Sequence, residues 1–194
     1  MPLCVGDKLG PHQIPTLMDK VGTEGNGPLI DTMRILRDGA LLSVVASTYL
    51  LVLLRFNPRI FLKHFPKEIR EIVPPKSEKE RRMSIMLGVP LGLLFIGSTF
   101  ASALLWRASA QGSLSFWELF AHVFGLFFVF NLVDLLILDW LIVCRFTPRW
   151  LIIPGTEHIV MPKEYLYHFE GFLMGTVVSV IGGLAIAAPL HFLF

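Results

Sequence analysis

Four polar side chains lie beyond the first turn of one long apolar segment, residues 117–144. They are His122, Asn131, Asp134 and Asp139. A carboxylate near the centre of a membrane span costs about 2.5–3.5 kcal/mol on insertion scales, so such groups normally face protein or water and have a function. We therefore expect these four residues to form a polar intramembrane site.

The spacing of these residues limits the chemistry of that site. Asn131 and Asp134 are three residues apart and share one helix face. Asp139 is rotated from Asp134 by about 140° on a regular α-helix, so the two carboxylates are not expected to form a tight acid–base pair. Asp134 then has three open readings: a structural hydrogen-bond donor or acceptor, a proton or cation carrier, or a catalytic acid.

Two further titratable residues, His168 and Glu170, stand where the last apolar segment begins. They are expected at the cytoplasmic mouth of the membrane domain, near the place where Asp139 emerges. The sequence has no HExxH, CxxC or paired HxxxH spacing, and no GxSxG or Walker A pattern. No metal site and no cofactor are therefore expected.

The elements that position these residues are predicted from composition. The chain has 194 residues, of which 54% are hydrophobic and 16% charged, with a mean hydropathy of +0.64. Long apolar runs predict an all-α integral membrane protein with four transmembrane helices, and a net charge of +2 gives no reason to expect a nucleic-acid partner. The predicted spans are residues 39–56, 84–106, 117–144 and 169–194, joined by long loops 57–83 and 145–168. Residues 1–30 are expected to be a mostly irregular tail, and residues 31–194 a single membrane domain.

A repeated phrase predicts how the four spans are organised. The sequence RFNPR at residues 55–59 returns as RFTPR at 145–149, and IVPPK at 72–76 returns as IVMPK at 159–163. The second pair, and the pair Gly88 and Gly175, are both 87 residues apart. We interpret this order as a tandem duplication, which predicts two parallel two-helix repeats that together form a bundle.

Charge asymmetry predicts the orientation. Twelve Lys and Arg residues lie on the side of the two long loops, and five lie on the opposite side. The positive-inside rule then places both loops in the cytoplasm and both termini outside, in the cell membrane if the source is prokaryotic. The alternative is a first span that fails to cross, because its strictly apolar part is short.

The basic corners of the repeats predict a lipid contact. Arg55, Arg59, Arg145 and Arg149 stand where apolar segments end, and guanidinium groups bind phosphate well. We expect them to anchor the protein to anionic lipids of the inner leaflet, with a more specific phosphate site as an alternative. Loop residues such as Phe65 and Ile69 recur near helical spacing, which predicts an amphipathic stretch lying on the membrane surface.

Small residues recur at every fourth position of the last span. This stripe consists of Gly171, Gly175, Ser179, Gly183 and Ala187. Small residues let helix backbones approach closely in lipid. The stripe is expected to pack against another helix of the same chain, and a seam for a homo- or hetero-oligomer is the alternative.

These features indicate a multi-pass membrane protein that binds or conducts a small solute, proton or lipid through the polar site on the third span. One alternative is a membrane-embedded enzyme acting on a lipid or isoprenoid. Another is an accessory or assembly subunit of a membrane complex. The sequence does not decide whether the chain is an enzyme.

Overall fold

The computed structural model describes residues 30–111, 113–159 and 163–193. The expected tail, residues 1–30, lies almost entirely outside this range, as do the middle of the IVMPK echo and Phe194. The described residues form helices and connecting turns, with no strand among them. In chain order the elements are α2 (Thr32–Phe56), η1 (Pro58–His64), α3 (Lys67–Ile72), α4 (Glu78–Ser109), α5 (Phe116–Val133), η2 (Asp134–Phe146), η3 (Arg149–Leu151) and α6 (Tyr165–Phe192).

Four helices are long and apolar enough to cross a membrane, which confirms the all-helical membrane class. They are α2, α4, α6 and the continuous pair α5–η2 (Phe116–Phe146), with lengths of 25, 32, 28 and 31 residues. The shortest corresponds to about 37 Å at 1.5 Å per residue, more than a hydrocarbon core of about 30 Å. The first helix begins at Thr32, seven residues before the apolar span expected from the sequence.

Local capping residues explain where these helices begin. The Asp31 side chain accepts a hydrogen bond from the Arg34 backbone N–H and starts α2. Ser77 with Glu80, and Ser115 with Glu118, form complete capping boxes at the starts of α4 and α5. A capping box satisfies two backbone N–H groups that the helix itself leaves unpaired, so these polar residues extend the helices beyond their apolar runs.

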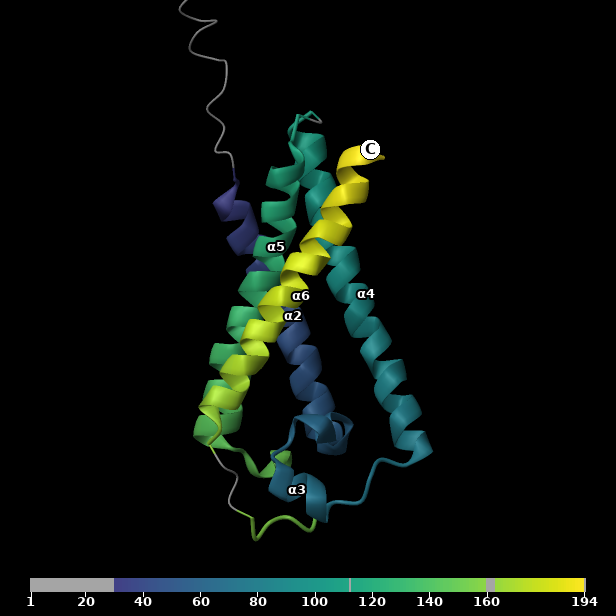
Figure 1. The fold of residues 1–194 in the computed structure, drawn as a ribbon, viewed down its shortest axis with the longest axis vertical. Coiled ribbons are helices and arrows are strands. Elements are labelled where there is room, and N and C mark those ends of the chain that lie inside the picture. The colour runs from purple at the N-terminus through teal and green to yellow at the C-terminus, as the bar shows by residue number, and fades with distance from the viewer. Residues whose placement is uncertain (1–29, 112, 160–162, 194) are drawn as a thin grey trace, which may run out of the picture. The chain divides into compact units, whose positions relative to one another are not determined.

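The helix pair α5–η2 is central to the arrangement (Figure 1). α5 packs most extensively against α6 and α2, whereas α4 diverges from the other helices towards the end that carries the loops. The buried residues of α4 all lie in its last third, between Thr99 and Trp106. Of these, Ala103 and Trp106 join a core cluster with the first half of α5 and the last part of α6, including Leu119, Val123 and Ala187.

Glycines set the closeness of the α2–α5 contact. A Cβ added at Gly39 would meet Val129 Cβ at 2.9 Å, and a Cβ added at Gly125 would meet Ile35 Cγ2 at 2.7 Å. Each glycine therefore accommodates a branched side chain of the other helix. This seam, which the sequence reading did not identify, lets the backbones approach as small residues do in membrane helices generally.

Most of the small-residue stripe of α6 is covered by α5. A Cβ at Gly175 would collide with the Asn131 side chain, and one at Gly183 would meet Phe120 Cε2 at 3.0 Å. Ser179 and Ala187 are buried. Gly171 differs, because a Cβ added there meets nothing within 4 Å. The stripe from Gly175 onwards thus packs within the chain.

The two long loops lie at one end of the helices, here named the loop end (Figure 1). Phe65, Ile69 and Val73 of the first loop are buried in a cluster with Leu151 and Ile153 of the second. The expected amphipathic stretch therefore does not lay this apolar face on lipid. The second loop covers it instead.

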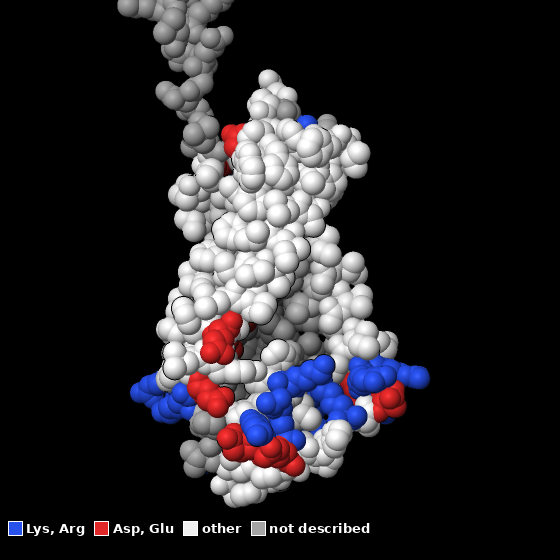
Figure 2. Space-filling model, viewed as in Figure 1, with Lys and Arg blue, Asp and Glu red and all other residues white. Residues whose placement is uncertain are grey.

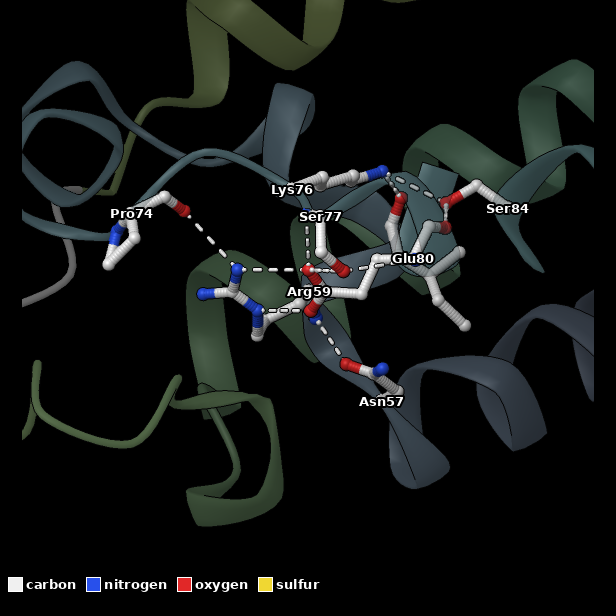
Figure 3. A network of polar contacts seen from close by, with 8 residues as sticks. Asn57, Arg59, Pro74, Lys76, Ser77, Glu80 and Ser84 are labelled. Atoms are coloured by element: carbon white, nitrogen blue, oxygen red, sulfur yellow. Dashed lines mark hydrogen bonds and ion pairs between the residues drawn. The ribbon is translucent and has the colours of Figure 1, made fainter. Parts of the chain in front are cut away.

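A polar network ties the first loop to the start of α4 (Figure 3). Arg59 Nε lies 2.6 Å from Glu80 Oε1, and Arg59 also donates to the Pro74 carbonyl at 3.2 Å. Lys76 Nζ donates to the Ile60 carbonyl and to Ser84 Oγ. These contacts close the loop between α2 and α4 into a fixed platform at the loop end.

Candidate functional site

The helix that carries the expected site changes its hydrogen-bond register at Asp134. From Asp134 to Phe146 the chain forms a π-helix, in which each N–H bonds to the carbonyl five residues earlier. Residues five apart then lie closer to one helix face than they do on a regular α-helix. Asp134 and Asp139 are five apart, so this register reduces the angular separation expected from α-helical spacing. π-Helical segments are rare and are found frequently at functional sites.

Both carboxylates line one partly open cavity of about 610 Å³ at the loop end. Its walls come from α2, η1, α5, η2, α6 and the two loops, and α4 contributes none of the lining residues. The titratable lining residues are His64, Asp134, Asp139, Glu164, Tyr167, His168 and Glu170, and Asn131 is also part of the wall. Figure 2 shows acidic side chains beside a hollow, above the band of basic side chains at the loop end.

Asp139 and His168 meet inside this cavity. Asp139 Oδ1 lies 3.1 Å from His168 Nδ1, and the two side chains are 27% and 14% exposed. The contact joins η2 to α6 and is an ion pair when the imidazole is protonated. Glu170, two residues further on, also lines the cavity. The structure therefore brings together Asn131, Asp134, Asp139, His168 and Glu170 of the site residues expected from the sequence.

The Asn131 side chain forms hydrogen bonds between two helices. Its amide nitrogen donates to the Phe172 carbonyl at 2.9 Å and to Thr176 Oγ1 at 3.2 Å. These bonds occupy its donors and join α5 to α6. Asp134, three residues later, has no hydrogen-bond partner in the described part of the chain. Its carboxyl group is half-buried in the cavity wall.

Of the acidic and histidine residues that line the cavity, the sequence analysis missed His64 and Glu164. Both belong to loops, and only the docking of η1 and the second loop beneath the helices brings them to the cavity. His64 is exposed as a residue, but the protein around its ring excludes water and lowers the pKa of the imidazole. The carboxylate of Asp139 opposes this shift, and Lys76 reinforces it. Since the pKa lies below its usual value of about 6.5, the ring is neutral at pH 7.

His122 is not among the residues that line the cavity. Its Nε2 is 2.8 Å from Ser102 Oγ, and the same hydroxyl donates to Asp38 Oδ2 at 2.6 Å. The Ser102 hydroxyl has one proton, which it donates to Asp38 when that carboxylate is ionised. The hydroxyl oxygen then accepts a hydrogen bond from His122 Nε2–H. His122 is fully buried beside the Trp106 ring, and its Nδ1 has no partner among the described residues. This relay joins α2, α4 and α5 at the end opposite the loops.

The four repeated arginines have different surroundings. Arg59 is held by Glu80, as described above. Arg55, Arg145 and Arg149 are exposed at the loop end, and no ion pair within the described ranges involves them. Figure 2 shows a band of Lys and Arg side chains at this end. Three of the four are therefore available to a phosphate group.

Comparison with known proteins yields no relative from which a function could be transferred. No family model matches the chain, and neither does any curated protein or solved structure. Within residues 30–111, 113–159 and 163–193, no group of three or more His, Cys, Asp or Glu side chains is arranged to hold a metal ion.

Proposed function

We propose that this integral membrane protein binds a small, partly apolar ligand in the loop-end cavity. The observation that carries the proposal is the convergence of Asp134, Asp139 and His168 on one partly open cavity. A volume of about 610 Å³ lies within the usual range of ligand pockets, roughly 300–1,000 Å³. Such sites combine apolar walls with a few polar groups, as this one does.

Binding is favoured over conduction by the packing of the opposite half. The cavity ends within the loop half of the helices. Beyond it, Leu119, Val123 and Ala187 belong to a cluster that fills the space between α4, α5 and α6. The His122 relay also lies in that half, where Ser102 contacts His122 Nε2 and donates to Asp38. A ligand is therefore proposed to enter and leave from one side.

The proposed topology places this cavity near the cytoplasmic face, with both loops cytoplasmic and the termini outside. The count of twelve basic residues against five supports it. We also propose two parallel two-helix repeats arranged as a bundle. In support, α2 ends at Phe56 and η2 at Phe146, the same position of the repeated phrase, and a short 3₁₀ segment follows each. The exposed Arg55, Arg145 and Arg149 are proposed to contact anionic headgroups of the inner leaflet.

Site-directed blocking of the cavity tests the binding proposal. Gly171 lines the cavity and a Cβ added there meets nothing within 4 Å, so Gly171→Phe should place a ring at the cavity wall and reduce the space for a ligand. Gly88→Phe is the matched control, because Gly88 on α4 has equal space but lies outside the cavity. The assay is photolabelling of the full chain in nanodiscs by alkyl diazirine probes, with labelled peptides identified by mass spectrometry.

We expect saturable labelling of η2 and α6 peptides, lost in Gly171→Phe and retained in Gly88→Phe. An excess of the same probe without its diazirine group should reduce this labelling. Labelling that rises without saturation and is equal in both variants would instead mean that the probe reports lipid exposure alone, and the binding proposal would be wrong.

The Asp139–His168 contact supports a second candidate, a membrane-embedded enzyme acting on a lipid or isoprenoid. A separation of 3.1 Å is within reach of proton transfer, and the cavity has apolar walls. In this case His168→Gln should stop conversion of an isotopically labelled lipid extract while photolabelling of the cavity persists. An extract left unchanged by the unmodified protein would count against this candidate.

The third possibility, an accessory subunit that docks through the α6 stripe, has less support. α5 already covers the stripe from Gly175 to Ala187. A partner would have to use the outward face of α6 or the divergent half of α4 instead.

A further inference from the structure

We infer that the ligand of this cavity is an amphipathic organic cation, an amine whose charged head lies between the carboxylates and whose apolar body lies along the helices. The inference rests on the proposed binding function and adds the chemical class of the ligand. Four carboxylates line the cavity, from Asp134, Asp139, Glu164 and Glu170, and no Lys or Arg is part of its described lining. The lining is therefore strongly acidic.

The two histidines do not balance this charge. His64 is neutral at pH 7, as argued above. His168 can be positive, and its contact with Asp139 would then use that charge. Three further acidic groups, Asp134, Glu164 and Glu170, remain without a cation from the cavity wall. A head that brings its own positive charge is the ligand that this lining favours.

Asp134 gives the most specific reason for a cation. It is the acidic group deepest along η2, and the described part of the chain offers it no hydrogen-bond donor. The amide of Asn131, three residues before Asp134, already donates to Phe172 and Thr176. A carboxylate at membrane depth normally pairs with another group. An ammonium head supplies both the charge and the donors that Asp134 lacks.

The remaining walls suit an organic cation rather than a metal ion. Rings from Phe61, Phe65, Tyr167 and Phe172 are part of the lining, and aromatic faces attract ammonium groups. Leucines of α2 and η2 supply apolar surface for the body of the ligand. No three metal-ligating side chains in the described ranges converge as a metal site would require. An anionic lipid head would meet carboxylates where it needs donors.

Three photolabelling probes that share one alkyl diazirine chain separate the possibilities. Their heads are a primary amine, an alcohol and a carboxylate, so only the charge differs. With the full chain in zwitterionic nanodiscs at pH 7, the amine should label η2 and α6 peptides at about tenfold lower concentration than the alcohol, because bonds to charged groups are roughly twice as strong as neutral ones. The carboxylate should label least.

Variants that remove one carboxylate charge show which residue causes the preference for the amine probe. Asp134→Asn keeps the shape of the side chain and should reduce the preference for the amine over the alcohol by at least about fivefold. Glu78→Gln is the matched control, since Glu78 is an exposed carboxylate at the same end that does not line the cavity. It should leave the preference unchanged. If Asp134→Asn does not fold, the ranking of the three probes on the unmodified protein still decides.

The outcomes distinguish the proposed binding function from the proposal that the ligand is a cation. Saturable labelling by all three probes with equal strength overturns the cation assignment and leaves the binding function intact, as expected if Asp134 acts as a neutral hydrogen-bond donor. A preference for the carboxylate also overturns it. Absence of saturable labelling by any probe removes the binding function itself.

Discussion

A single methyl group at Gly175 should disturb the contact between α5 and α6. A Cβ at this position would stand 2.9 Å from Asn131 Cγ and 3.1 Å from Asn131 Nδ2, inside the normal contact distance. The Asn131 amide has little freedom to move, because it is held by the Phe172 carbonyl and by Thr176 Oγ1. Gly175→Ala should therefore displace the amide and weaken both bonds.

The expected magnitude follows from three terms. Overpacking by one methyl group costs about 1–3 kcal/mol. An interhelical polar contact in a membrane protein contributes about 0.6 kcal/mol. Replacing glycine by alanine in a helix returns up to about 1 kcal/mol of propensity. Gly171→Ala receives the same propensity gain without a clash, so comparison with it cancels that term. The difference in unfolding free energy between the two variants should be about 2 kcal/mol.

Reversible unfolding in mixed micelles, followed by circular dichroism, measures this difference. Gly175→Ala should be less stable than Gly171→Ala, and the latter should equal or exceed the unmodified protein. Equal stabilities of the two variants would refute the close approach of α6 to Asn131. They would also remove the argument that the Asn131 donors are unavailable to Asp134.

Three further predictions concern other parts of the chain. Ser102→Ala should lower the unfolding free energy by about 1–3 kcal/mol, because it leaves Nε2 of the fully buried His122 without the Ser102 hydroxyl; a neutral result in micelle unfolding would contradict the relay. Arg59→Gln should release the first loop from Glu80, seen as faster hydrogen exchange at residues 58–77, and unchanged exchange would argue against the polar network. The pKa of Asp31 is lowered by the hydrogen bond from the Arg34 backbone N–H. The ionised Asp31 carboxylate thus stabilises the start of α2 above the unfolded pKa of about 3.9, and this stabilisation is lost as pH falls through the lowered pKa of the folded state. Hydrogen exchange at the start of α2 should therefore accelerate only in acid.

The four spans could be predicted because apolar runs of membrane length leave few alternatives. The phrase RFxPR also marked helix ends correctly, since Phe56 ends α2 and Phe146 ends η2. Proline at the second residue after each phenylalanine disfavours continuation of the helix. The helix α2 begins seven residues before the expected span 39–56, because its first turns are polar and depend on the Asp31 cap rather than on hydropathy.

The arrangement within the site was harder to predict. Periodicity on a regular α-helix separated Asp134 from Asp139, and no feature of the sequence signals the π-helical register that begins at Asp134. His122 was grouped with these residues because it shares their segment. Its contacts are instead with Ser102 and Asp38, and Asp38 lies just outside the expected span 39–56. Side chains on different helices meet through packing geometry, which spacing along one helix does not encode.

The central claim is that η2 and α6 bring Asp139 and His168 together at one cavity. Cysteine cross-linking with a short bifunctional methanethiosulfonate reagent tests it most directly, after Cys4 and Cys144 are replaced by serine. The pair Asp139→Cys with His168→Cys should cross-link rapidly in native membranes. The pair Asp139→Cys with Leu166→Cys should not, since Leu166 is 78% exposed. Equal yields from the two pairs, or none from the first, would contradict the account.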